Sequence, residues 1–272
     1  MAARVILTDL GRKSYADSLA LQQREFNALL DAKASKEVLK DASQCAAEAS
    51  KCEPQDTSKG VAVGERRAGT IFMVEHPAVY TLGRNGHDEN LLVGEAGIRA
   101  SGAEFYRTDR GGDITFHGEG QIVVYPVIDL EMTGMGLREY ITSLEQAVID
   151  TMALYGITCC RSAGASGVWL EGGACGVKCG GEKEPSVRSA EQKLRKICAI
   201  GVRSSRYVVM HGLALNVATD LRRFSLINPC GFADRGVTSM LEELGYAPDM
   251  QEVKSRLAER LAARLGVFVD NR

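Results

Sequence analysis

Residues 196–217 read KICAIGVRSSRYVVMHGLALNV. Two apolar runs, at 196–203 and 207–217, flank a short polar stretch, which is typical of a β-hairpin. We expect both runs to be strands that pair with each other. A further apolar run, GVWLE at 167–171, is expected to form a hairpin with the 196–203 strand, interrupted by the segment between them.

The predicted sheet continues towards the N-terminus with four more strand-like runs, rich in apolar and β-branched residues. They are TIFMVEH from residue 70, AVYTLGR after Pro77, GAEFYRTD near residue 105, and QIVVYPVIDL at 121–130. Proline cannot donate a backbone hydrogen bond to a neighbouring strand, so we expect Pro126 to lie at an edge or a bend.

Three segments carry apolar residues at helical spacing: 13–33, 137–155, which Gly156 ends, and 250–265. Strands outnumber helices, and the two do not alternate in a βαβ rhythm. The sequence therefore predicts an α+β fold, a central mixed or antiparallel sheet with flanking helices packed on one face.

We expect a single domain over residues 1–272 that carries two flexible insertions. Residues 34–69 are polar and small, so they are predicted to be partly disordered. Residues 172–194 are rich in Gly, Lys and Glu and separate the two strands of the predicted hairpin.

The composition argues against several classes of protein. There are 33 basic and 35 acidic side chains, whereas nucleic-acid binders usually carry an excess of Lys and Arg, so we expect no nucleic-acid partner. No apolar run approaches the roughly 20 residues that span a bilayer, so we expect no membrane insertion. The first 26 residues contain no apolar stretch of the kind found in secretory signals, so we expect none, and we expect the eight cysteines to be reduced thiols. Cys175 and Cys179 have the spacing of half a zinc site, but no second half follows, so we predict no metal.

A dense glycine stretch, RGGDITFHGEGQ at 110–121, is the first candidate for a binding site. Its glycines permit a ligand to approach the main chain, and Arg110 and His117 lie among them. The alternative is a strand–turn–strand connection in which glycine serves only the turn. The stretch is neither a P-loop nor a Rossmann fingerprint, because it has no GK[ST] ending and its glycine spacing differs.

A cysteine in a forced turn is the second candidate. Cys230 lies between Pro229 and Gly231 in NPCGFADRGVTS at 228–239, where backbone N–H groups can also converge as an oxyanion site. A cysteine with a reference pKa near 8.5 is only a few per cent thiolate at pH 7, so a reactive one needs a nearby base or cation. Spacing leaves five candidates for that activator: His76, His87, His117, His211 and Lys196, the last either neutral or as an ammonium ion.

The residues around these candidates suggest the kind of substrate. His211 in MHGLALN is either a core histidine or a site residue. The segments ICAIGV and GLALNV are apolar, so an aliphatic acyl group fits a pocket lined by them better than a sugar or nucleotide does. A thiol, an activating cation or base and a glycine-lined pocket together predict acyl transfer.

The sequence closely resembles the lipoyl(octanoyl) transferase family. The resemblance is carried by RGGDITFHGEGQ, by RKICAIGVR with the following HGLALN, and by NPCGFADRGVTS, with GVWL and EHPAVYTLGR in support. It implies a biotin/lipoate protein ligase-like fold, with Cys230 as the nucleophile and Lys196 as its activator. The implied substrate-binding residues are Arg110, Gly111, Gly112, Asp113, Ile114, Thr115, Phe116, His117, Ala199, Ile200, Gly201, His211, Gly212, Leu213 and Ala214. The sequence departs from the family pattern at Glu119, where proline is common, and in the insertion before Lys196.

The resemblance implies that octanoyl moves from octanoyl-acyl carrier protein onto Cys230, and then onto a lysine of a lipoyl domain, without a cofactor. The implied acceptors are the E2 subunits of 2-oxoacid dehydrogenases and the glycine cleavage H protein. Three alternatives remain: an octanoyl amidotransferase between lipoyl-type proteins, an ATP-dependent lipoate or biotin ligase, and a non-catalytic binding module. The blocks RKICAIGVR and RGGDITFHG favour a mitochondrial member, with the cytoplasm of a bacterium as the alternative.

Overall fold

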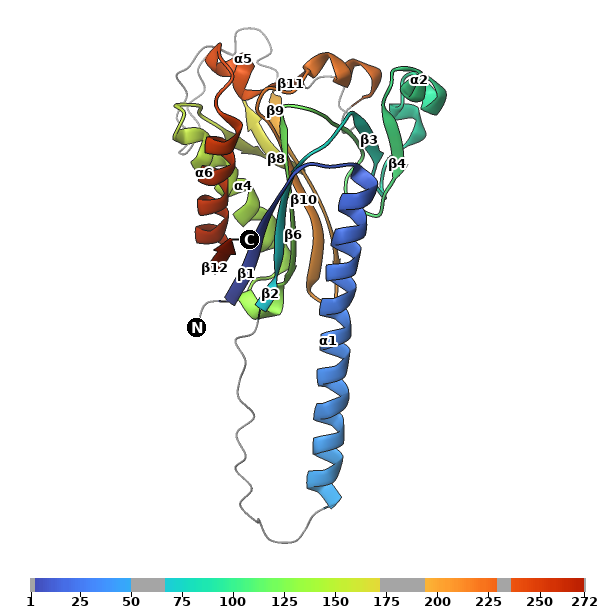
Figure 1. The fold of residues 1–272 in the computed structure, drawn as a ribbon, viewed down its shortest axis with the longest axis vertical. Coiled ribbons are helices and arrows are strands. Elements are labelled where there is room, and N and C mark those ends of the chain that lie inside the picture. Colours follow the sequence, from blue (N-terminus) through green and yellow to red (C-terminus); the bar gives the residue numbers. More distant parts are fainter. Residues whose placement is uncertain (1–2, 50–66, 172–193, 229–235, 272) are drawn as a thin grey trace.

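The computed structural model of the protein describes residues 3–49, 67–171, 194–228 and 236–271. A long twisted sheet forms the centre of this part of the chain (Figure 1). The strands, in spatial order, are β12 (Val267–Asn271), β1 (Ala3–Arg12), β2 (Arg67–Glu75), β6 (Gln121–Asp129), β10 (Val208–Asn216), β9 (Arg195–Ser205), β8 (Ala165–Leu170) and β7 (Cys160–Ser162), with β11 (Gly236–Val237) beside β9.

The sheet is mixed, which confirms the predicted fold class. Strand β1 runs parallel to both β12 and β2, and β11 runs parallel to β9, while the other neighbours are antiparallel. The predicted hairpin of residues 196–217 is present as β9 and β10, with Cys198 opposite Leu215 and Val202 opposite His211. Strand β8 lies on the other side of β9, as expected.

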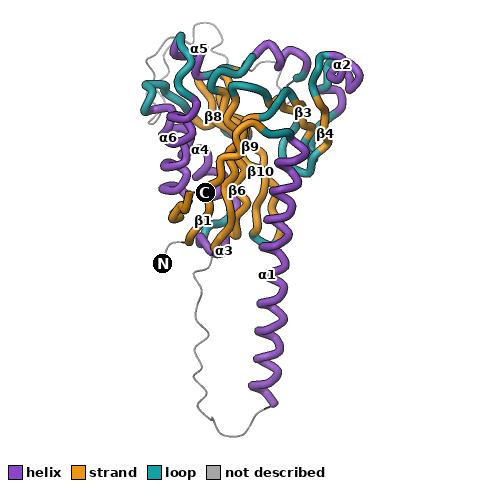
Figure 2. Tube along the Cα trace, viewed as in Figure 1, coloured by secondary structure: helices purple, strands orange, loops and turns teal. Residues whose placement is uncertain are grey.

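Helices cover both faces of this sheet, whereas the sequence predicted helices on one face. Figure 2 shows α1 (Tyr15–Ala49) on one side of the strands, and α4 (Leu137–Ala153) with α6 (Met250–Leu265) on the other. Every residue of β6 and β10 is buried. Strands buried on both faces read as continuous apolar runs rather than alternating ones, and they need a cover on each side.

The N-terminal helix is longer than its apolar pattern predicts. Helix α1 continues through residues 34–49, the first part of the predicted insertion. These residues are rich in Ala, Lys and Glu, which favour helix without needing an apolar face. Strand β2 then begins at Arg67, inside the predicted insertion, and residues 50–66 lie outside the described part of the chain. Almost all of the second insertion, residues 172–193, also lies outside it.

Pro126 lies in a central strand, so the prediction of an edge position was wrong. The alternative prediction was a bend, and the pairing of β6 with β10 is interrupted around Pro126. The pairing of β10 with β6 runs as far as Val209 opposite Ile128 and resumes at Leu213 opposite Val124. Within that gap, His211 has a φ of 60°. A Cβ at Gly212 would lie 2.6 Å from Pro126 Cδ, so only glycine permits this approach.

A second, smaller sheet stands beside one end of the first (Figure 1). It contains β4 (Glu104–Arg107), β3 (Val79–Leu82) and β5 (Ile114–His117) in that order. Tyr80, Phe116 and Phe224 pack in its core, with ring centroids 4.9 Å apart for Tyr80–Phe116 and 5.7 Å for Phe116–Phe224. The short helices α2 (Gly94–Ala100), η1 (Asp88–Asn90) and η2 (Leu221–Leu226) surround it, while α3 (Leu130–Thr133) and α5 (Met240–Leu244) flank the large sheet.

Candidate active site

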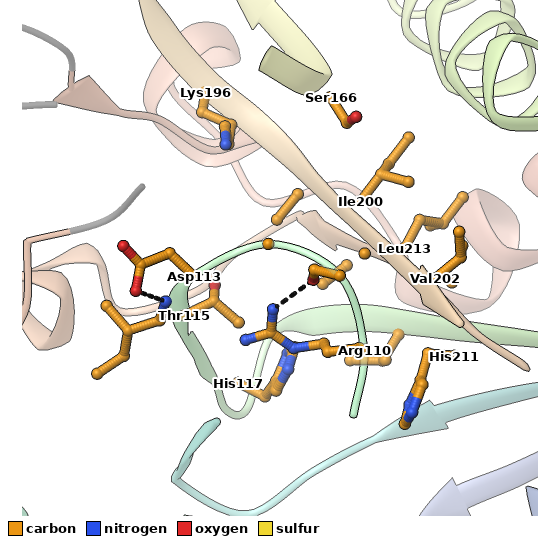
Figure 3. A pocket seen from close by; sticks show the side chains of 18 of the residues that line it. Arg110, Asp113, Thr115, His117, Ser166, Lys196, Ile200, Val202, His211 and Leu213 are labelled. Atoms are coloured by element: carbon orange, nitrogen blue, oxygen red, sulfur yellow. Dashed lines mark hydrogen bonds between the residues drawn. The ribbon is translucent and has the colours of Figure 1, made fainter. Parts of the chain in front are cut away.

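A cavity of about 660 Å³ lies between the two sheets. Its walls come from β9 and β10, from the glycine stretch and β5, from the start of α4, and from the turn between β7 and β8 (Figure 3). All of the predicted site residues line it except Phe116 and Cys230. Phe116 instead packs in the core of the small sheet, as the alternation of side chains along β5 requires. Cys230 lies outside the described residues.

The glycine stretch closes onto the β9–β10 hairpin at Gly201. The Gly111 N–H donates to the Val202 carbonyl at 2.9 Å. A Cβ on Gly201 would lie 2.6 Å from the Gly111 carbonyl oxygen, so the two backbones touch only because both residues are glycines. The buried Arg110 guanidinium supports this loop by donating to the Thr81 carbonyl at 2.6 Å and to the Gly111 carbonyl at 3.0 Å (Figure 3).

Asp113 joins the loop to the neighbouring turn of the small sheet. Its carboxylate accepts from the N–H of Ile114 at 2.7 Å, from the N–H of His87 at 3.3 Å, and from the side chain of Asn90. Asn90 in turn accepts from the Asn228 N–H at 2.8 Å through its backbone carbonyl. The residue two positions before Cys230 is therefore fixed beside residues that line the cavity.

Lys196 projects from the first residues of β9 and lines the cavity while remaining only 8% exposed. Its Nζ atom lies 4.4 Å from the centre of the Trp169 ring. Lys196 pairs with Val237 of β11, the short strand that follows the cysteine segment in the sequence. The far end of the cavity is at His211, which is opposite Val202 and thus roughly 20 Å further along β9 (Figure 3).

A chain of buried hydrogen bonds runs behind the cavity from His117 to the backbone of Lys196. His117 Nδ1 donates to the Gln121 side chain at 2.8 Å, and Gln121 donates to Asn216 Oδ1 at 2.8 Å. Asn216 Nδ2 donates to the Thr238 carbonyl at 3.0 Å, and the Thr238 N–H donates to the Lys196 carbonyl at 3.0 Å. Desolvation lowers the pKa of His117 to about 3, so its imidazole is neutral near pH 7.

The other buried histidines also act as hydrogen-bonding groups. His211 Nε2 lies 2.8 Å from the Asp109 carboxylate, and burial lowers the pKa of His211 despite that partner. His76 donates from Nδ1 to the Lys13 carbonyl and accepts from the Tyr125 hydroxyl, each at 2.8 Å. Desolvation lowers the pKa of His76 to about 4. The remaining candidate histidine, His87, lines the cavity and is exposed.

Several lining residues were missed by the sequence analysis, among them Tyr15, Asn90, Gln121, Tyr125, Ser166 and Asn216. Gln121 and Asn216 did carry a signal, because each is a polar residue at the end of an otherwise apolar strand. An amide in that position needs a buried partner, and the two supply it to each other. Tyr15 and Asn90 come from distant segments and carry no such signal.

Buried cysteines are poor nucleophiles, and Cys198 and Cys159 are of this kind. Cys198 lies two residues from Lys196 on β9, but it is fully buried, and desolvation raises the pKa of its thiol to about 12. Cys159 is buried as well. Cys175 and Cys179, for which we predicted no metal role, lie outside the described residues. In the described ranges, no three His, Cys, Asp or Glu side chains are grouped as a metal site.

The family described as "Lipoyl protein ligase A/B catalytic domain" matches residues 61–262, and the chain belongs to this family. Its curated relatives include the octanoyltransferase of Bacteroides fragilis, 53% identical over 74% of this chain and 84% of the relative. The octanoyltransferase of Parabacteroides distasonis is 44% identical over 92% and 93%, and that of Flavobacterium johnsoniae is 40% identical over 96% of each. These relatives confirm the predicted class of enzyme, an acyltransferase of the octanoyltransferase type.

Solved structures confirm the predicted fold. A bipartite lipoate protein ligase from Thermoplasma acidophilum superposes with a TM-score of 0.63 at 13% identity, covering 99% of this chain and 87% of the ligase. A lipoate-protein ligase A bound with ATP gives 0.60 at 14% identity, covering 100% and 90%. At such identities the likeness shows the fold alone.

The relatives give no support to the predicted mitochondrial location. All those named here are bacterial, which favours the bacterial alternative. The two blocks that suggested an organellar member line the cavity or carry its lysine. Residues that form the site do not distinguish a mitochondrial protein from a bacterial one, because the chemistry of the site does not depend on the compartment. No helix within the described ranges is long and apolar enough to cross a bilayer.

Proposed function

We propose that this chain transfers an octanoyl group from octanoyl-acyl carrier protein to a specific lysine of lipoyl domains, by way of a thioester on Cys230. The observation that carries the proposal is the position of Lys196. This lysine is almost fully buried in the wall of the cavity, and it pairs with the strand that follows the cysteine segment.

The described residues on either side of the cysteine segment are both anchored at the cavity. Cys230 is two residues after Asn228, which is bonded to Asn90 at the cavity, and seven before Val237, which pairs with Lys196. The thiol of Cys198, although closer to Lys196 in sequence, has its pKa raised to about 12 by burial. A thiolate is the reactive form, so Cys198 is not a competing nucleophile at neutral pH.

The contact with Trp169 sets a ring face against the lysine, and such a face attracts a cation. We assign Lys196 as the cation that stabilises the Cys230 thiolate and as the group that supplies a proton to the departing thiolate.

The cavity suits a medium-length acyl chain. Its 660 Å³ falls in the usual range for small-molecule sites. Ile200, Val202 and Leu213 form an apolar wall between Lys196 and His211. Burying the six methylenes of an octanoyl group contributes about 5 kcal/mol at ~0.8 kcal/mol each.

The reaction has two balanced steps. In the first, the Cys230 thiolate attacks the donor thioester, a new C–S bond forms, and the carrier thiolate leaves with the proton held by Lys196. In the second, the amine of the acceptor lysine attacks the acyl-enzyme, a C–N bond forms, the C–S bond breaks, and the amine proton returns to the Lys196–Cys230 pair. Thioester exchange is nearly neutral and amide formation is downhill, so neither ATP nor a cofactor is required.

Family membership indicates lipoyl-domain proteins as partners. We assign the E2 subunits of 2-oxoacid dehydrogenases and the glycine cleavage H protein as acceptors, and the cytoplasm of a bacterium as the location. We keep one catalytic domain for the whole chain, because the cavity uses residues from Tyr15 to Val237.

The test is intact-mass measurement after incubation of the full chain with octanoyl-acyl carrier protein and no ATP. We expect a gain of one octanoyl group that Cys230→Ala abolishes, that Lys196→Ala slows strongly, and that a lipoyl domain discharges. An unmodified wild-type mass would contradict the assigned donor. Labelling only from an octanoylated lipoyl protein would identify an amidotransferase, and labelling of the lipoyl domain only with octanoate and ATP would identify a ligase.

A further inference from the structure

We propose that Trp169 is a positioning residue for the reaction: the face of its ring holds the Lys196 side chain in place inside the cavity. This deepens the proposed function, because it concerns the group that we assign as activator of Cys230. Nothing in the resemblance or in the sequence pattern assigns Trp169 a role at the site.

The contact is close and dry. Lys196 Nζ lies 4.4 Å from the Trp169 ring centre, well inside the roughly 6 Å over which a ring face attracts a cation. Trp169 is 1% exposed and Lys196 8%. Water screens such an attraction at exposed sites, so exclusion of water strengthens it here.

The backbone around the pair is shaped to make this contact. Lys196 and Trp169 are direct partners across the β8–β9 ladder, at a register shift between Val168 and Trp169. Gly167, just before that shift, has a φ of 125°, and a Cβ there would lie 3.5 Å from Lys196 Cε and 2.6 Å from the Cys198 carbonyl. The clash with the Cys198 carbonyl means that only glycine lets β8 approach β9 this closely beside the lysine, whose Cε would be in ordinary contact with the added atom.

Glu145 fixes this irregular stretch of β8 from behind. Its buried carboxylate, carried by α4, accepts from the Gly167 N–H at 3.0 Å. The other carboxylate oxygen lies 3.1 Å from Arg161 Nε. The ring that meets Lys196 therefore belongs to a strand segment held in one conformation.

The charged groups on the neighbouring elements largely cancel one another. Glu145 pairs with Arg161, and Arg195, next to Lys196 on β9, pairs with Glu243 of α5. Other titratable groups on the packed elements include Cys160 on β7, Cys198 and Arg203 on β9, and His211 on β10; across the cavity, Asp113 is bonded to its own loop.

The ring solves a specific electrostatic problem. Burial in an apolar wall disfavours a charged group. An aromatic face attracts a cation without carrying a negative charge of its own, so it can hold the lysine in an apolar cavity.

The first test measures the pH dependence of Cys230 alkylation by iodoacetamide in the full chain, with the site resolved by peptide mass spectrometry. Trp169→Leu is expected to raise the pH midpoint by about half to one unit, and Trp169→Phe, which keeps a ring, by less. Lys196→Met should also raise the midpoint, and Trp169→Leu added to Lys196→Met should raise it no further. A folded Trp169→Leu protein with the wild-type midpoint would overturn the proposal.

The second test needs no change at Trp169. In protein labelled with ¹³C at the lysine ε-carbon, the Lys196 ε-protons should resonate upfield because of the indole ring current. Lys196→Met should remove that signal and so assign it. If no upfield lysine signal exists, the proposal is wrong. If the signal exists but Cys230→Ala still forms the acyl-enzyme, the positioning of Lys196 stands and the proposed nucleophile fails.

Discussion

Asn216 donates a hydrogen bond from its side chain to the backbone carbonyl of Thr238, at 3.0 Å and out of contact with solvent. The Thr238 N–H bonds to Lys196 at the same distance. One amide side chain thus holds the strand that follows the cysteine segment against the strand that carries the lysine.

Replacing Asn216 should therefore lower the free energy of unfolding of the protein. Asn216→Ala leaves the Gln121 amide and the Thr238 carbonyl buried without this partner, and each such loss costs about 1–3 kcal/mol. We expect urea denaturation to show a loss of about 2–4 kcal/mol in unfolding free energy. Asn27→Ala, on the exposed side of α1, is the matched control and should stay within about 0.5 kcal/mol. A neutral Asn216→Ala would show that the hydrogen-bond chain does not stabilise the fold.

Gly201→Ala should impair catalysis while leaving the protein folded. The added methyl meets the Gly111 carbonyl at 2.6 Å, so the glycine loop has to move away from β9. Displacement of a binding loop by about 1 Å can slow a reaction about 100-fold, and we expect a 10- to 100-fold lower rate of acyl-enzyme formation. Circular dichroism should remain native-like. Gly136→Ala is the control, since nothing lies within 4 Å of its added Cβ; equal effects of the two changes would argue against a specific role for the loop contact.

Cys198 should be chemically silent in the folded protein. Burial raises the pKa of its thiol to about 12, so almost no thiolate exists at pH 8. Iodoacetamide should leave Cys198 unlabelled in native buffer and label it in urea, as peptide mass spectrometry can establish. Cys198→Ala should still form the acyl-enzyme. An octanoyl group found on the Cys198 peptide would reverse the assignment of the nucleophile.

Stability should fall as the pH falls from about 6.5 towards 4. His76 is held neutral, with a pKa of about 4 in the folded state against about 6.5 in the unfolded chain, so the unfolded state binds more protons between these values. Its stabilising contribution is complete above pH 6.5 and is lost progressively down to the folded pKa. The lower pKa of His117 extends the same trend to about pH 3.

The measurement is the urea midpoint at several pH values between 8 and 4.5. His76→Gln should flatten the dependence, since it removes one of the buried groups that must charge. His87→Gln, at an exposed histidine, should leave it unchanged. If His76→Gln and the wild type lose stability in parallel, other groups dominate the acid response.

The strands of the site were predictable because their apolar runs are long and bounded by turns, as for β9, β10 and β8. The edge strand β12 and its neighbour β1 were missed. They are half-buried and lie at opposite ends of the sequence, so only their parallel pairing makes them strands of this sheet. Helices cover both faces because β6 and β10 are fully buried; their continuous apolar runs carried this signal, but the sequence analysis did not use it.

The site itself was predictable to the extent that motifs carry their own chemistry. The glycine stretch and the lysine strand were found because glycine density and a charge at the start of an apolar run are local features. The sequence analysis did not single out Trp169. In the sequence it resembles an ordinary core residue, and only the register of β8 with β9 places it opposite Lys196. Phe116 was assigned to the site because it lies within a motif. Its side chain instead points into the core of the small sheet, because side chains alternate along β5.

The pairing of β11 with β9 also has a consequence for the order in which the chain assembles. The two neighbours of the lysine strand, β8 and β10, are complete by Asn216, whereas Val237 joins the same strand later in the sequence. A chain that emerges from its N-terminus can therefore build the lysine's surroundings before the residues around position 230 reach them.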